Sequence, residues 1–262
     1  MTRALITACR KFRHCLHAQP RVSNNEADTA NALAQFLEQH AQLKPTHTNV
    51  GGGAGVVFQI HGEKERDCSR SVLLRADIDA LPLVESGTTN IKHISQVEGA
   101  HHACGHDGHT AMLAGALVQL KSIASSFSGR VIAIFQPAEE TGDGAKQMLD
   151  AVPDILSENI TRGAYALHNI PGEPLGKVIL RSGVGARLTN PKLIGQPNQK
   201  ILRIHRASCG VRIRLTGQAS HASEPHKGLS PVPALTRLLQ GSLLTGLPKR
   251  LLANGSMAPQ VT

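Results

Sequence analysis

The sequence predicts a layered α/β fold. Short apolar runs typical of strands alternate with longer segments whose apolar residues recur every three or four positions, as in amphipathic helices. The chain has 262 residues, 40% of them hydrophobic, which is enough to bury a sizeable core. Glycine and proline are too few for a disordered or fibrous chain.

The first predicted element is an amphipathic helix over residues 25–43. Its apolar positions recur at steps of three and four, and Ser23 or Asn24 is expected to cap it. Strands are then predicted over 55–60 and 71–75, after a glycine-rich turn. This order of helix and strands begins the α/β layer.

The middle of the chain continues the alternation of helices and strands. The pattern predicts a helix over 107–125, a strand over 130–135, a helix over 142–151, and strands over 164–167 and 177–181. Together with the preceding elements, they form the expected first domain.

The composition changes after this point. Residues 186–205 contain prolines, asparagines and basic residues without a clear period, so a linker or insertion is expected. A strand over 211–216 and a helix over 231–244 that opens with proline follow. Because one strand and one helix cannot enclose a core, we expect a first domain over 1–184 and an incomplete second domain over 185–262.

Charge divides the chain in the same way. Residues 1–173 carry 15 Lys and Arg against 18 Asp and Glu, whereas residues 174–262 carry 13 against Glu224 alone. The basic part could attract an anionic partner, but aromatic residues are too few for a single-stranded nucleic-acid platform. No apolar run reaches the length of a membrane span and the N-terminus lacks a signal-peptide pattern, so a cytoplasmic protein without membrane contact is expected.

A dense group of metal-ligand types occurs in HHACGHDGHT, residues 101–110, directly before the 107–125 helix. A thiolate at Cys104 and an imidazole at His106 can converge on one cation, and Asp107 can cap the helix or orient a ligand ring. The alternative is a His-rich polar loop with a buried cysteine. The five cysteines form no CxxC pair, so a disulfide framework and a zinc knuckle are not indicated.

Further polar residues stand at the ends of three predicted strands. Glu139 and Glu140 follow one strand, His168 ends another, and Asp77 and Asp79 leave a third. Ligands bind at strand ends in α/β sheets, so one glutamate can bind metal while its neighbour acts as a general base, and the aspartates can hold a ligand histidine. The alternatives are a charged helix start, a core histidine and a turn before proline.

These segments resemble a known family. In order along the chain, the matching blocks are LLRADIDALPLVE, HHACGHDGHTAMLAG, FQPAEETGDGAKQML, ALHNIPGEPLGKVILRSG and VRIRLTGQASHASEPHKG. They are similar to successive signature blocks of the peptidase M20 amidohydrolases, in the subgroup of hippurate hydrolases, N-acyl-amino-acid amidohydrolases and auxin-conjugate hydrolases.

The resemblance implies a zinc-peptidase-like mixed sheet flanked by helices, with a partial α+β lid domain through which homodimers form. It also implies two divalent metal ions, zinc or manganese, with cobalt or nickel as further possibilities. Their ligands would be Cys104, with its thiolate bridging the metals, and His106, Glu140 and His168. Thiolate and imidazole favour zinc or a later transition metal, while carboxylates also accept manganese.

The same resemblance assigns the remaining site residues. Glu139 would be the general base that activates water, Asp79 the supporting aspartate, and His221 of the lid the group that stabilises the oxyanion from a neighbouring subunit. The implied activity is hydrolysis of the amide bond of N-acyl amino acids or related small amides.

One departure from the family pattern bears on activity. The resemblance implies a later segment that completes both domains and supplies the last metal-ligand histidine, and the sequence is expected to be a C-terminally truncated member. We therefore expect poor solubility or reliance on a partner, and weak hydrolysis. The alternative is a catalytically impaired remnant whose basic C-terminal half binds an anionic partner.

Overall fold

A computed structural model describes residues 2–64, 70–86, 93–156, 163–169, 172, 214–238 and 240 of the chain. The chain divides into two compact units, Met1–Ile204 and His205–Thr262. The predicted strand 177–181 and the segment 186–205 lie outside the described residues. Among the described residues, no helix has the length and apolar character needed to cross a membrane.

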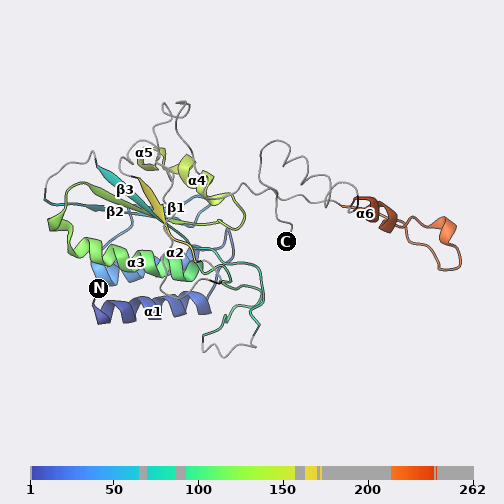
Figure 1. The fold of residues 1–262 in the computed structure, drawn as a ribbon, viewed down its shortest axis with the longest axis horizontal. Coiled ribbons are helices and arrows are strands. Elements are labelled where there is room, and N and C mark those ends of the chain that lie inside the picture. Colours follow the sequence, from blue (N-terminus) through green and yellow to red (C-terminus); the bar gives the residue numbers. More distant parts are fainter. Residues whose placement is uncertain are drawn as a thin grey trace. The chain divides into compact units, whose positions relative to one another are not determined.

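The first unit is a five-stranded mixed sheet with helices on both faces (Figure 1). In chain order its elements are α1 (Arg3–Ala18), α2 (Ala27–Ala41), β1 (His47–Val50), β2 (Gly55–His61), β3 (Ser71–Asp77), α3 (His106–Ser122), a short 3-10 helix η1 (Ala124–Ser126), β4 (Arg130–Gln136), α4 (Gly144–Ala151), α5 (Pro153–Leu156) and β5 (Ala164–Ala166). The strand order is β1-β2-β4-β3-β5. The predicted mixed α/β fold is confirmed.

Strand direction in the sheet explains where polar residues meet. β1 and β4 pair antiparallel to β2, whereas β3 runs parallel to both β4 and β5. In the β3–β4 register Asp77 lies opposite Gln136, and in the β3–β5 register Arg75 lies opposite Ala166. The residues that follow these three strands therefore leave the sheet at one edge.

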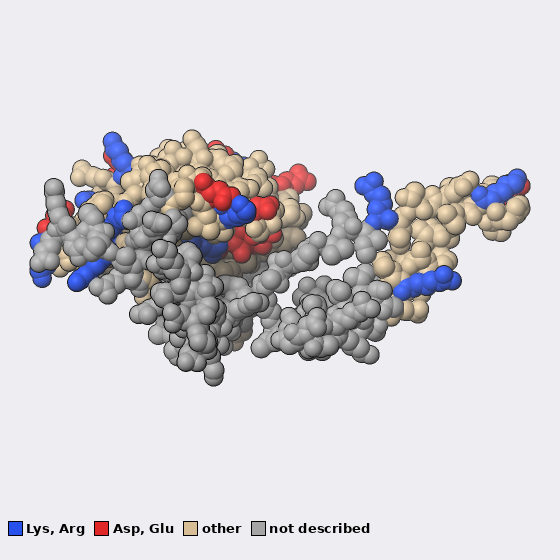
Figure 2. All heavy atoms as spheres, turned by 90° about the horizontal axis from the view of Figure 1, so that it is seen from above, with Lys and Arg blue, Asp and Glu red and all other residues tan. Residues whose placement is uncertain are grey.

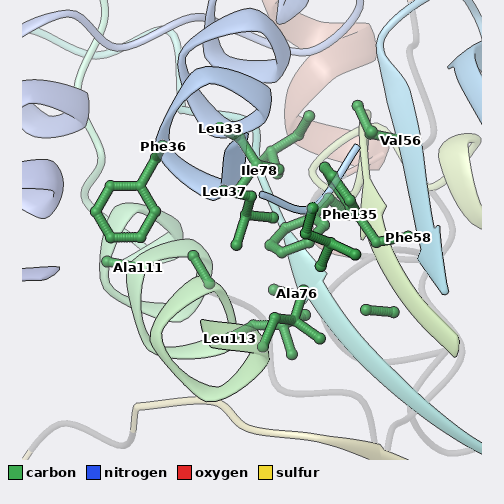
Figure 3. Packing of buried hydrophobic residues seen from close by; sticks show 14 of the residues in the cluster. Leu33, Phe36, Leu37, Val56, Phe58, Ala76, Ile78, Ala111, Leu113 and Phe135 are labelled. Atoms are coloured by element: carbon green, nitrogen blue, oxygen red, sulfur yellow. The ribbon is translucent and has the colours of Figure 1, made fainter. Parts of the chain in front are cut away.

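The two faces of the sheet have separate cores. Figure 3 shows the larger one, where Phe58 and Phe135 of the sheet meet Leu33, Leu37 and other side chains of the covering helices. α1, α2 and α3 cover this face, and α4 and α5 lie on the other side of the sheet in Figure 1. The smaller core consists of Val50, Val57, Leu73, Ile132, Ile134, Met148 and Val152. Alternate strand residues point to opposite faces, so β2 and β4 contribute to both cores.

The N-terminal region differs from the sequence prediction. α1 is a helix that the apolar pattern did not reveal, because only Phe12 and Leu16 of it are buried. The helix predicted over 25–43 is α2, but Glu26 occupies its N-cap position without a side-chain cap bond, so the predicted cap at Ser23 or Asn24 is wrong. Ser23 instead donates its hydroxyl to Asp79 Oδ2 at 2.8 Å.

The second unit contains a 3-10 helix η3 (Pro225–Lys227), α6 (Val232–Leu238) and an isolated bridge between Gln218 and Leu229. α6 lies within the helix predicted over 231–244. Residues 214–216 of the strand predicted over 211–216 have no regular structure, and the rest of that strand lies outside the described residues. None of residues 214–238 is buried.

Charged side chains are distributed differently in the two units. Figure 2 shows both acidic and basic side chains on the face of the first unit that is in view. In residues 214–238 of the second unit, Glu224 is the acidic residue, and it pairs with Lys227 at 2.6 Å between Oε1 and Nζ. Arg214 and Arg237 are the other charged side chains of this stretch.

Candidate metal centre

Segments distant in sequence converge at the edge where β3, β4 and β5 end. Asp79 follows β3, Glu139 and Glu140 follow β4, and His168 follows β5. α3 begins at the same place with His106, directly after Cys104 and Gly105. The structure thus brings together six of the seven predicted site residues.

Gly105 permits the turn that presents Cys104 and His106 to this edge. Its φ is +85°, in the left-handed region that residues with a Cβ rarely adopt. A Cβ at this position would lie 2.5 Å from Asn169 Oδ1. A side chain here would therefore displace the side chain of Asn169, which follows β5.

Cys104, His106 and Glu140 each place one ligand atom within 4.8 Å of the others. His168 joins this group, because its Nε2 lies 3.4 Å from Cys104 Sγ. The Nδ1 of His168 is 2.8 Å from the carbonyl oxygen of Asn169 and can donate to it, which leaves Nε2 as the free ligand atom. The chemistry of this donor set suits zinc.

His106 has the clearest geometry of a metal ligand. Its Nδ1 lies 2.9 Å from the carbonyl oxygen of Asp79 and 3.2 Å from Asp79 Oδ1, so it donates there and Nε2 holds a lone pair. Nε2 is buried without a hydrogen-bond partner and lies 3.8 Å from Glu140 Oε1, which is buried and unpartnered too. A buried contact between these two atoms requires a proton on one of them or a cation between them, and a metal ion can take the place of that proton, so these residues fit a metal.

Electrostatics in the group also favour a cation. Burial, together with the carboxylates of Glu140 and Glu139, raises the pKa of the Cys104 thiol to about 12. Burial raises the pKa of Glu140 as well. Both side chains are therefore held away from their ionised forms by excess negative charge and low solvation. A divalent cation would reverse this balance and favour the thiolate.

Asp79 positions His106 and Glu140 through hydrogen bonds on the side away from the ligand atoms. Its Oδ1 faces His106 Nδ1, while its Oδ2 accepts from the Glu140 backbone N–H at 2.9 Å and from the Ser23 hydroxyl. Burial would raise its pKa, but the hydrogen bonds from His106, Glu140 and Ser23 lower it overall, so the carboxylate stays ionised. This arrangement sets the orientation of one ligand ring and of the Glu140 backbone.

Glu139 differs from its neighbour in exposure. Its side chain is 40% exposed, against 19% for Glu140, and its Oε2 lies 3.9 Å from His106 Nε2. A carboxylate that is near the ligand group and still reaches solvent is suited to exchange protons with a bound substrate.

The sequence interpretation did not assign His109, although it lies in the same motif. Its Nδ1 lies 2.8 Å from Asp77 Oδ1, and its Nε2 accepts the backbone N–H of Asn169 at 3.1 Å. Asp77, His106, His109 and His168 also place ligand atoms within 4.8 Å of one another. Its place three residues after His106, one helical turn away, was the signal that could have identified it.

Of the two roles expected for Asp107, capping α3 and orienting a ligand ring, the first is wrong. It does not cap α3, whose N-cap position is Gly105. Its Oδ2 instead contacts His17 Nδ1 at 2.9 Å and Arg13 Nε at 3.1 Å. Asp107 therefore connects the start of α3 to α1.

His221 lies in the second unit, where its Nδ1 is 2.8 Å from Ser223 Oγ and accepts the Ser223 backbone N–H at 3.3 Å. His221 and the ligand group belong to different compact units, so the role of His221 toward that group stays a prediction.

Comparison with known proteins identifies relatives. Residues 73–256 match the profile of peptidase family M20/M25/M40. The chain is 33% identical over 229 residues to N-acetyl-L-cysteine deacetylase of Bacillus subtilis, covering 87% of this chain and 47% of that protein. It is 32% identical over 231 residues to hippurate hydrolase of Campylobacter jejuni, covering 87% of this chain and 52% of that protein. The chain spans about half the length of these curated relatives.

A solved structure supports the same relationship. The YXEP protein of Bacillus subtilis, described as a dinuclear metal-binding peptidase of the M20 family, matches with a TM-score of 0.59 and 33% identity. The match covers 66% of this chain and 45% of that one.

Proposed function

This chain belongs to peptidase family M20/M25/M40, and from that membership we propose a metal-dependent amidohydrolase that cleaves the amide bond of N-acyl amino acids or related small amides. The observation that carries the proposal is the pair of buried, unpartnered atoms, His106 Nε2 and Glu140 Oε1, beside Cys104. The deacetylase and hippurate hydrolase names of the relatives support the substrate class.

The proposed ligands are Cys104, His106, Glu140 and His168, which would hold two divalent ions. Zinc suits the thiolate and imidazoles, and manganese, cobalt and nickel are the other candidates. When bound, such ions polarise an amide carbonyl and lower the pKa of water. Asp79 and the Asn169 carbonyl keep the ligand nitrogens of His106 and His168 directed inward.

Glu139 is the proposed general base. Its exposed carboxylate beside the ligand group can take a proton from the attacking water and deliver it to the leaving amine nitrogen. His221 of a second copy of the chain is proposed to stabilise the oxyanion in a homodimer formed through residues 185–262, the partial lid. The domain limits and the cytoplasmic location expected from the sequence stay predictions.

The test compares Glu139→Gln with Glu140→Gln, and uses the exposed Glu98→Gln as the matched control. Zinc or manganese content is measured by elemental mass spectrometry, and hydrolysis is followed with N-acetyl amino acids and hippurate. We expect Glu139→Gln to keep its metal and lose about 10²- to 10⁴-fold in kcat, the usual contribution of a general base. Glu140→Gln should lose metal, and Glu98→Gln should change neither.

Two results would overturn the proposal. Undiminished turnover in Glu139→Gln would contradict the role of Glu139 as general base. A metal-loaded chain that hydrolyses no N-acyl amino acid would contradict the proposed substrate class. Binding of an anionic partner that weakens with salt and is unaffected by Glu139→Gln would favour the non-catalytic alternative.

A further inference from the structure

We propose that the first unit holds an additional zinc site, formed by His17, Glu85 and His101. His17 lies in the last turn of α1, and Glu85 lies in the irregular segment that follows β3. His101 pairs with Leu81 through an isolated β-bridge. Each of the three places one ligand atom within 4.8 Å of the other two. None of them belongs to the ligand group of Cys104, and the inference does not depend on the proposed hydrolysis.

The distances from the Glu85 carboxylate to the two imidazoles match those between ligand atoms of a tetrahedral zinc ion. Glu85 Oε1 lies 3.3 Å from His17 Nε2 and 3.4 Å from His101 Nε2. With zinc bonds of about 2.0–2.1 Å, tetrahedral ligand atoms are roughly 3.3–3.4 Å apart. The two rings stand at 88° to each other with centroids 5.5 Å apart, as for rings that approach one point from different directions.

Neighbouring groups already orient two of these ligands. His17 Nδ1 lies 2.9 Å from Asp107 Oδ2, which directs Nε2 toward Glu85, as carboxylates do behind zinc-bound histidines. Glu85 Oε2 accepts the backbone N–H of Ser95 at 2.6 Å, which leaves Oε1 facing the two imidazoles. The side chains of His17, Glu85 and His101 are only 12%, 8% and 22% exposed.

The site opens into a hollow of about 310 Å³, which supplies room for a fourth ligand. Arg13, His14 and His93 also line this hollow. The charge of Arg13 is balanced in part by Asp107, whose Oδ2 lies 3.1 Å from Arg13 Nε. Two histidines, one carboxylate and an open position form the ligand set of zinc sites that keep a coordination place for water or a small anion.

Zinc stoichiometry after equilibration at a buffered free zinc concentration tests this site. We expect His101→Gln to bind one zinc fewer than the unmodified chain, and the matched control His14→Gln, from the same hollow, to bind as many as the unmodified chain. Cys104→Ala separates the two sites, because it should retain a zinc ion that the further change His101→Gln removes. Loss of zinc in Cys104→Ala with none lost in His101→Gln would overturn this proposal and leave the hydrolase proposal intact.

Glu85→Gln provides a second variant, and circular dichroism establishes which variants fold. Equal zinc content in the unmodified chain and in either folded variant overturns the proposal. His17 would then be an imidazolium that bridges Asp107 and Glu85 by hydrogen bonds, without a metal role.

Discussion

Helix α3 has two parts that are buried for different reasons. Its first turn buries His106, Asp107, His109 and Thr110, and its later turns bury Ala111, Leu113, Ala114, Gly115 and Leu117. The polar part is held by hydrogen bonds to Asp77 at the end of β3, to Asp79 just after it and to α1, whereas the apolar part packs into the core shown in Figure 3. The apolar part therefore places the helix, and the polar part uses that placement to form the metal centre.

The largest expected effect comes from the apolar part. Leu117 is completely buried, so Leu117→Ala should lower the free energy of unfolding by about 2–5 kcal/mol through lost contacts and a cavity. Because Leu117 lies outside the ligand group, the loss should be the same with and without zinc. Urea unfolding in both conditions measures this loss. A loss confined to the zinc-bound form would show that the apolar part of the helix also contributes to zinc binding.

An intermediate effect is expected where the polar part meets its support. Asp79→Asn weakens the acceptor behind His106 Nδ1, so zinc affinity should fall by about 10- to 100-fold, the usual cost of changing such a group. That corresponds to about 1.4–2.7 kcal/mol less stabilisation by saturating zinc. Zinc titration monitored by thermal unfolding provides the measurement, with Leu117→Ala as the control that should keep its affinity. Unchanged affinity in Asp79→Asn would contradict the positioning role.

The smallest effect concerns Glu26, a fully buried carboxyl at the start of α2 whose Oε1 accepts the Ala138 N–H at 2.8 Å. Burial raises its pKa above the ordinary 4.5, so the native state holds this proton more tightly than the unfolded chain. Its contribution to stability is therefore largest in acid and is lost as pH rises through the native pKa.

Glu26→Gln removes the cost of ionising this buried carboxyl at high pH. The stability of the variant relative to the unmodified chain should therefore increase from pH 4 to pH 8. Thermal unfolding of both proteins across that range provides the measurement. A difference that does not vary with pH would show that the Glu26 carboxyl titrates normally.

Local patterns predicted most of the first unit. Seven elements lie close to their predicted positions: strands β2, β3, β4 and β5 and helices α2, α3 and α4. Their apolar residues recur with a strand or helix period within a short stretch of sequence, so the sequence alone indicates them. α1 escaped prediction since only two of its residues are buried, and the cap of α2 was misassigned because Ser23 bonds to Asp79 instead.

The sequence by itself determined which residue types stand at the strand ends and before α3, since a short motif such as CGHDGH records ligand identity and spacing directly. Only the tertiary structure decided that Asp79 supports His106 while Asp77 supports His109. It also decided that His106 Nε2, which has no hydrogen-bond partner, lies 3.5 Å from Asp77 Oδ2 and 3.8 Å from Glu140 Oε1. The physical reason is that such contacts join residues distant in the chain, and they depend on the parallel register of β3 and β4 and on the packing that places α3 above their ends.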